Sequence, residues 1–172
     1  MFLKPEWATN AVYKILDSKP VIENAGEFTT EMLESILFDY EGDKQPYIVR
    51  LMKKFELCFE VEKDIFLIPE LLNPEKQDFD RNYNNNLRFE YHYDFMPAGI
   101  MARFIVRTRN MVHNKTFWKN GVILQRENTR ALVESDQYLK KIMIWINGVN
   151  APFFLEILRK ELDEIHTSLN YG

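Results

Sequence analysis

The sequence is poor in glycine and has a single cysteine. Six of its 172 residues are glycine, and neither Gly-x-x-x-x-Gly-Lys-Ser/Thr nor Gly-x-Gly-x-x-Gly occurs. Such loops cradle nucleotide phosphates with backbone N–H groups, so this chain is not expected to bind nucleotides in that way. The lone Cys58 excludes a disulfide framework and a cysteine zinc cluster, and it fits a reducing cytoplasm.

Signals for export or membrane insertion are also missing. The first ten residues, MFLKPEWATN, contain no long apolar stretch of the signal-peptide kind. No uncharged run approaches the roughly 20 residues that a membrane-spanning helix needs. We therefore expect a cytoplasmic protein without a membrane span. With 46% hydrophobic and 14% aromatic residues, it has enough apolar side chains for one ordinary domain or two small ones.

The net charge of −4 conceals two halves of opposite sign. Residues 1–80 contain 9 basic and 17 acidic side chains, which gives −8, whereas residues 81–172 contain 13 and 9, which gives +4. A chain that changes sign near its middle is expected to consist of two parts with different neighbours.

The acidic half has the pattern of a small helical domain. Hydrophobic spacing predicts helices over residues 6–17 and 30–40 and from Pro46 onward, with Thr29 or Thr30 as the cap of the second helix. A short extended piece is expected at 21–23. A β-hairpin is expected from 57–61 and 65–68 around the turn 62–64. This order of elements, over residues 1–72, is typical of a winged helix.

The polar segment 73–86 is interpreted as a linker to an α/β half over residues 87–172. There the pattern predicts a strand at 87–95, a helix at 99–110, strands at 118–125, 129–134 and 139–147, and a closing helix after Asn150. In the last strand, Ile142, Ile144 and Ile146 are expected on one face, with Met143 and Trp145 on a second, covered face. The fold class is therefore α+β, with an N-terminal winged-helix-like subdomain, a mainly antiparallel sheet and a C-terminal helix.

The strand at 87–95 shows the clearest alternation in the chain. Four aromatic side chains alternate with four charged ones: Phe89, Tyr91, Tyr93 and Phe95 with Arg88, Glu90, His92 and Asp94. The aromatic face is expected to pack in the core, and the alternative is that it anchors a partner, as Tyr and Phe often do. The charged face is interpreted as solvated, with a metal site at Glu90, His92 and Asp94 as the alternative.

Other chemistry-bearing residues have simpler structural explanations. Cys58 lies in an apolar strand with no histidine nearby in sequence, so we expect a buried, inert thiol. Arg50, Lys53 and Lys54 occupy the third predicted helix, which enters DNA in winged-helix binders. Because their half carries −8, a solvated helix face is favoured over a nucleic-acid interface.

The most basic stretch of the chain follows the aromatic strand. It contains Arg103, Arg107, Arg109, Lys115 and Lys119. Nucleic acid stacking on Phe117 and Trp118 is one interpretation. A protein partner, or the acidic half of another subunit, is favoured.

Several stretches together resemble the COR domain, the C-terminal-of-Roc domain of Roco GTPases, which often carry leucine-rich repeats. The matching stretches in chain order are PEWATNAVYKIL from Pro5, LMKKFELCFEV from Leu51, IPELL from Ile68, LRFEYHYDFMPAGIMARFIVR from Leu87, FWKNGVIL from Phe117, TRALV from Thr129, and ILRKELDEIH from Ile157. Their order and their near-complete coverage of the chain make the set specific.

The resemblance implies a non-catalytic module that transmits between a Roc GTPase domain in the same polypeptide and homodimerisation through the C-terminal half. GTP or GDP and magnesium would bind to Roc, and no cofactor is expected in this chain. The aromatic strand matches a family region near the Roc contact. The candidate interface residues are Tyr91, Tyr93, Phe95, Arg103, Arg107 and Trp118. A winged-helix nucleic-acid binder is the alternative, although we expect no nucleic-acid partner.

Overall fold

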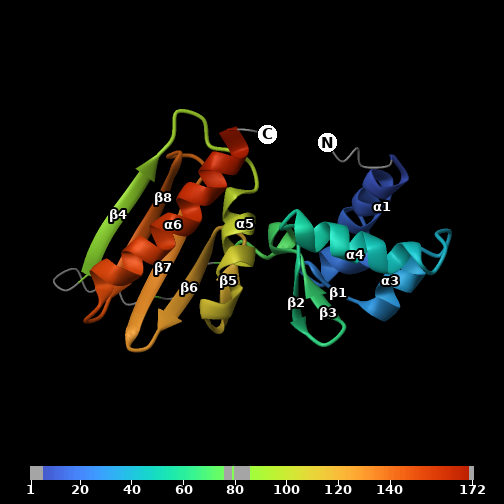
Figure 1. Cartoon of the computed structure of the whole chain (residues 1–172), viewed down its shortest axis with the longest axis horizontal. Coiled ribbons are helices and arrows are strands. Elements are labelled where there is room, and N and C mark those ends of the chain that lie inside the picture. Colours follow the sequence, from blue (N-terminus) through green and yellow to red (C-terminus); the bar gives the residue numbers. More distant parts are fainter. Residues whose placement is uncertain (1–5, 76–78, 80–85, 171–172) are drawn as a thin grey trace. The chain divides into compact units, whose positions relative to one another are not determined.

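The computed structural model describes residues 6–75, 79 and 86–170. It divides the chain into two compact units, Met1–Leu72 and Asn73–Gly172 (Figure 1). Helices dominate the first unit, and an antiparallel sheet with two helices forms the second. The predicted α+β class, with N-terminal helices, a mainly antiparallel sheet and a C-terminal helix, is confirmed.

Over its described residues, 6–72, the first unit combines four helices with a small sheet. The sheet has the antiparallel order β1-β3-β2. The elements are α1 (Glu6–Leu16), α2 (Lys19–Glu23), β1 (Glu27–Thr29), α3 (Thr30–Ile36), α4 (Lys44–Lys54), β2 (Phe59–Glu62), β3 (Ile65–Leu67) and a 3-10 turn, η1 (Pro69–Leu71).

The core of this unit joins the apolar faces of the helices to the sheet. Phe28 of β1 lies opposite Phe66 of β3, and their rings stack with centroids 5.3 Å apart. The predicted cap is present, because the Thr29 hydroxyl accepts a hydrogen bond of 3.1 Å from the N–H of Met32. Side chains with no exposed surface include Ala8, Ala11, Ile15, Val21, Leu37, Ile48 and Met52.

Two predictions in this unit are wrong. Residues 21–23 belong to helix α2 rather than to an extended piece, because Pro20 falls in the first helical turn, where its fixed φ suits a helix and its missing N–H costs nothing. The strand that pairs with the hairpin is β1, which begins six residues later, at Glu27. Helix α3 ends at Ile36, four residues earlier than predicted.

The second unit is a five-stranded antiparallel sheet in the order β4-β8-β7-β6-β5. Helix α6 runs across one face of the sheet with α5 beside it (Figure 1). The elements are β4 (Asn86–His92), α5 (Ile100–Arg107), a 3-10 turn, η2 (Arg109–Met111), β5 (Val112–Trp118), β6 (Gly121–Arg126), β7 (Thr129–Asp136), β8 (Lys141–Asn147) and α6 (Ala151–Asn170).

Both faces of this sheet are apolar at its centre, as predicted. Ile142, Ile144 and Ile146 are buried on one face. On the other face, Trp145 joins a cluster with a side chain from outside the sheet, Phe79. The remaining members of that cluster are Trp118, Ile123 and Leu132. Phe79 lies within the predicted linker 73–86, of which residues 76–78 and 80–85 lie outside the described residues.

Three boundaries in the second unit differ from the predictions. Strand β4 ends at His92, so Phe95 lies beyond it. Helix α5 ends at Arg107 and is followed by the turn η2. The predicted strand 118–125 is in fact the end of β5 and most of β6. The start of β5 is hidden from pattern analysis because Asn114 and Lys115 adopt left-handed φ angles of 48° and 55°, where the register shifts and the alternation breaks.

Candidate interaction surface

Tyr91 of β4 and Tyr93, one residue past the end of this strand, are hydrogen-bonded to helix α6. The Tyr91 hydroxyl donates to Asp163 Oδ1 at 3.0 Å, and the Tyr93 hydroxyl lies 2.6 Å from Nε2 of His166. Nδ1 of His166 faces Asp163 Oδ1 at 3.8 Å. Strand and helix thus share a chain of polar contacts at the edge of the sheet, and the half-buried rings leave part of their surface accessible.

Burial controls the protonation of this network. It raises the pKa values of both tyrosines, and neighbouring acidic groups add to the rise at Tyr93. Burial also lowers the pKa of His166, against the opposing effect of Asp163. The tyrosine hydroxyls therefore keep their protons, and a neutral His166 accepts from Tyr93 at Nε2 while its Nδ1–H faces Asp163.

Stability should decrease on mild acidification because of His166. Its folded pKa lies below the ordinary value of 6.5, so the unfolded chain takes up the proton first. The stabilisation is complete above pH about 6.5 and is lost as the pH falls through the folded pKa. We expect the urea midpoint of the second unit to drop between pH about 7.5 and about 5.5, a window in which carboxylates do not titrate. In His166→Gln this slope should be smaller; an unchanged slope would contradict the assignment.

The candidate residues Arg103 and Arg107 lie on α5, and Arg107 forms ion pairs within the second unit. Nε of Arg107 donates to Glu161 Oε2 at 2.7 Å, and its Nη2 contacts Glu164 Oε2. Both acids belong to α6, so Arg107 fixes α5 against α6 and its charge is neutralised there. Arg103 is half-buried one turn earlier on α5.

The two remaining candidate residues have opposite environments. Phe95 is 82% exposed, and the backbone contact between Tyr93 and Lys140 places it near the β7–β8 turn, where Tyr138 is 92% exposed. Trp118 is only 3% exposed and belongs to the cluster on the face of the sheet opposite α6. Phe95 can therefore meet a partner, whereas Trp118 serves the core.

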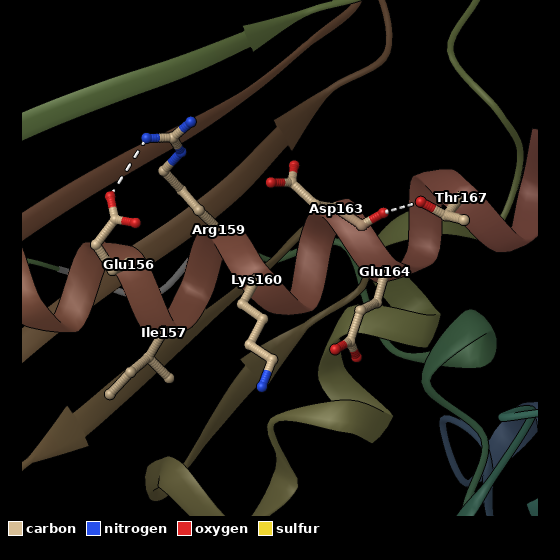
Figure 2. Close-up of a pocket in the computed structure, with 7 residues that line it drawn as sticks. All are labelled: Glu156, Ile157, Arg159, Lys160, Asp163, Glu164 and Thr167. Atoms are coloured by element: carbon tan, nitrogen blue, oxygen red, sulfur yellow. Dashed lines mark hydrogen bonds and ion pairs between the residues drawn. The ribbon is translucent and has the colours of Figure 1, made fainter.

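The outer surface of α6 was missed by sequence reasoning. Figure 2 shows an open pocket whose lining residues all belong to this helix. Two of them take part in the contacts described above, Asp163 with Tyr91 and Glu164 with Arg107. Arg159 contacts Glu156 at 3.3 Å and lies 4.6 Å from the Phe89 ring centroid. Charges spaced three or four residues apart in 156–164 were the available signal. The lining residues are Glu156, Ile157, Arg159, Lys160, Asp163, Glu164 and Thr167.

The charged face of β4 is organised by ion pairs. Glu90 contacts His92 Nε2 at 2.8 Å and Lys141 Nζ at 3.4 Å. Asp94 lies past the end of the strand, and its carbonyl accepts from Lys140. Within 6–75, 79 and 86–170, no group of three or more His, Cys, Asp or Glu side chains is placed to hold a metal ion.

The basic residues of α4 have little support as a nucleic-acid interface. Nζ of Lys53 pairs with Glu60 Oε2 at 3.1 Å and lies 5.1 Å from the centroid of the Phe66 ring. Lys54 also has an interaction within the chain, and Arg50 is exposed. Lys53 thus joins α4 to the hairpin, and its charge is partly neutralised.

Cys58 lies where an inert thiol was expected. It is buried in the core of the first unit, and burial raises its pKa to about 12. Because the thiolate is the reactive species, an aromatic disulfide reagent should leave Cys58 unmodified in the native protein at neutral pH and modify it after urea unfolding. Rapid reaction of the native chain would show that the first unit opens readily.

Among the helices of the described residues, none is long and apolar enough to cross a membrane.

Comparison with known proteins covers both units. The family model for the C-terminal of Roc, COR-A domain, matches residues 1–72, and that for the COR-B domain matches residues 84–171. A Roc-COR-CHAT protease of Runella zeae is 24% identical over 97% of this chain. The probable serine/threonine-protein kinase pats1 of Dictyostelium discoideum is 27% identical over 86% of it.

These relatives are much longer than the chain, which spans 18% of the Runella protein and 5% of pats1. A solved structure of Methanosarcina barkeri Roco2 RocCORdC bound to GDP is 38% identical, with a TM-score of 0.39, and it covers 41% of this chain and 24% of its own. The two family models confirm the resemblance found in the sequence. With family matches that cover nearly its whole length, the chain belongs to the COR domains of Roco proteins.

Proposed function

We propose that this chain is a non-catalytic regulatory module of a cytoplasmic Roco protein. Its second unit joins two copies of the protein. Both units transmit conformational changes between this dimer and a Roc GTPase domain in the same polypeptide. The match of COR-A and COR-B, in this order and over nearly the whole chain, carries the proposal. GTP or GDP and magnesium belong to Roc, which is consistent with the lack of phosphate-binding glycine motifs in the 172 residues.

The surface that supports this role lies along β4 and α6. Tyr91 and Tyr93 are half-buried yet held by hydrogen bonds to α6, and Phe95 is exposed at the end of the strand. Aromatic side chains already fixed in one conformation lose little entropy on contact with a partner. A displacement of β4 by a partner would pass directly to α6 through Asp163 and His166, and from α6 to α5 through Arg107.

Coupling of this kind is thermodynamically reciprocal. If the nucleotide on Roc favours one arrangement of COR, then COR pairing must change the nucleotide affinity by the same factor. Only differential contacts in the two states are required, so the chain needs no catalytic group of its own.

Sedimentation velocity of the 172-residue chain tests the pairing, and we expect a concentration-dependent dimer. A specific interface should bury at least roughly 1,000 Å². A strict monomer at high micromolar concentration would overturn the dimer role. Coupling is tested in the longer protein that contains Roc: GDP affinity should change between dilute, monomeric protein and concentrated, dimeric protein. Equal affinity in both would contradict coupling and leave pairing intact.

A further inference from the structure

Strand β4 forms an edge of the five-stranded sheet, with β8 on its inner side (Figure 1). Within the described part of the chain, no strand pairs with its outer side. An edge strand presents a row of backbone N–H and C=O groups that can pair with another strand.

The register identifies the backbone groups that point outward. The N–H of Tyr93 donates to the carbonyl of Lys140 at 2.9 Å, so this pair is of the hydrogen-bonded type. In an antiparallel ladder such pairs alternate with non-hydrogen-bonded ones. Residues 87, 89 and 91 therefore direct their N–H and C=O groups to β8, and those of Arg88, Glu90 and His92 point away from the sheet.

The side chains of this edge are complementary to a second copy of themselves. In two antiparallel β4 strands related by a two-fold axis at Phe89, Arg88 lies opposite the partner's Glu90, and Glu90 lies opposite the partner's Arg88. Each pair is a hydrogen-bonded one, because both residues present outward backbone groups. Opposite charges directly across an antiparallel pair are stabilising.

The neighbouring registers lack this match. An axis at Glu90 places Glu90 opposite the partner's Glu90, and an axis at Arg88 places Arg88 opposite the partner's Arg88. Like charges directly across a strand pair are destabilising. A shift of the partner strand by one residue instead places each residue with outward backbone groups opposite a residue whose backbone groups point to β8. Among the registers centred on Arg88, Phe89 and Glu90, charge and backbone pattern therefore select the axis at Phe89.

The opposite face of the strand adds apolar contacts in the selected register. Phe89 meets the partner's Phe89 as a non-hydrogen-bonded pair, the closer of the two antiparallel arrangements. Phe89 is half-buried, and the Arg159 guanidinium lies 4.6 Å from its ring centroid. Leu87 lies opposite the partner's Tyr91, whose hydroxyl group is fixed on α6. Paired aromatic residues at such positions favour strand association.

We propose that two copies of this chain associate through the outer edges of their β4 strands, with the two-fold axis at Phe89, to form one continuous ten-stranded sheet. The inference rests on the proposed function and specifies its interface. Such an interface is isologous and closes after two copies, so it makes a dimer and not a filament. It also places β4, and with it the contacts to α6, at the centre of the assembly.

Charge reversal tests the register. In Arg88→Glu, the new acidic side chain lies opposite the partner's Glu90. In Glu90→Arg, the new basic side chain lies opposite the partner's Arg88. Each repulsion occurs twice, because the two-fold axis repeats it. Each variant should weaken dimerisation at least about tenfold. An equimolar mixture of the two should form a heterodimer, because every pair is again of opposite charge. The double variant Arg88→Glu/Glu90→Arg should dimerise like the wild type. Lys119→Glu, the same charge change in the β5–β6 turn, should leave dimerisation unchanged.

Cross-linking tests the axis in the unaltered charge background. In Phe89→Cys the two introduced thiols face each other across a close pair, within the range that a disulfide spans. Mild oxidation should give a covalent dimer. Leu87→Cys, whose opposite residue is the partner's Tyr91, should give little. Efficient cross-linking of both variants would indicate random collision and would overturn the proposed axis.

The outcomes separate this inference from the function on which it rests. A wild-type dimer that is indifferent to both charge reversals would overturn the β4 interface and leave the dimer role intact. A wild-type chain that stays monomeric would overturn both. The strand pairing would be supported if each single variant dimerises weakly while the mixture of the two and the double variant dimerise normally. A general loss of stability would not be rescued by mixing the two variants.

Discussion

Replacement of Trp118 by alanine is expected to lower the free energy of unfolding of the second unit by about 3–5 kcal/mol, as is usual when a large buried aromatic side chain is truncated. The indole is 3% exposed and packs with Ile123, Leu132, Trp145 and Phe79. Its removal leaves a cavity on the face of the sheet opposite α6. Urea unfolding followed by circular dichroism measures the change, and hydrogen exchange assigns it to the second unit.

A matched control distinguishes core from interface. Phe95→Ala removes an aromatic ring that is 82% exposed, so it should change stability by no more than about 0.5 kcal/mol. If Trp118 were instead a partner anchor, its removal would spare stability and weaken association. That pattern, with Trp118→Ala as stable as the wild type, would refute the packing described for this face.

Gly26→Ala is expected to destabilise the first unit by about 2–5 kcal/mol, the sum of left-handed backbone strain and steric overlap. Gly26 has a φ of +89°, and a Cβ atom there would lie 2.3 Å from the carbonyl oxygen of Ile68. That carbonyl belongs to the backbone beside β3, and Gly26 itself accepts a hydrogen bond of 2.9 Å from the N–H of Ile68. The close approach of the two backbones therefore cannot relax through a side-chain movement.

The first unit offers its own control for this substitution. Gly42 has no atom within 4 Å of the position that a Cβ would take, so Gly42→Ala should stay within about 0.5 kcal/mol of the wild type. Hydrogen exchange over residues 6–72 reports on the unit without interference from the sheet of the second unit. Equal effects of the two alanines would contradict the close backbone approach between Gly26 and Ile68.

Predictions from sequence succeeded where one element has one dominant pattern. The isoleucines of β8, the stripe of α6 and the hairpin of β2 and β3 follow simple periods, so burial could be read directly from spacing. The extended piece at 21–23 failed because Pro20 is compatible with both a helix start and an extended chain. The beginning of β5 was missed because two polar residues with left-handed φ angles interrupt its alternation.

The candidate surface was only partly accessible to the same reasoning. Sequence analysis identified Tyr91, Tyr93 and Arg107, but it did not find their partners, which lie more than 50 residues further along the chain. Trp118 was placed on the surface because its immediate neighbours are basic, whereas its environment is set by strands that pair later in the sequence.

The sequence by itself determined the family, the change of charge sign between the halves, the α+β class and the absence of phosphate-binding glycine loops, since each depends on composition, local order or short-range periodicity. Only the tertiary structure decided which strand is left at the edge of the sheet, and which side chains are paired or buried. Strand order and side-chain contacts join residues far apart in the chain, and no local pattern specifies such non-local pairings.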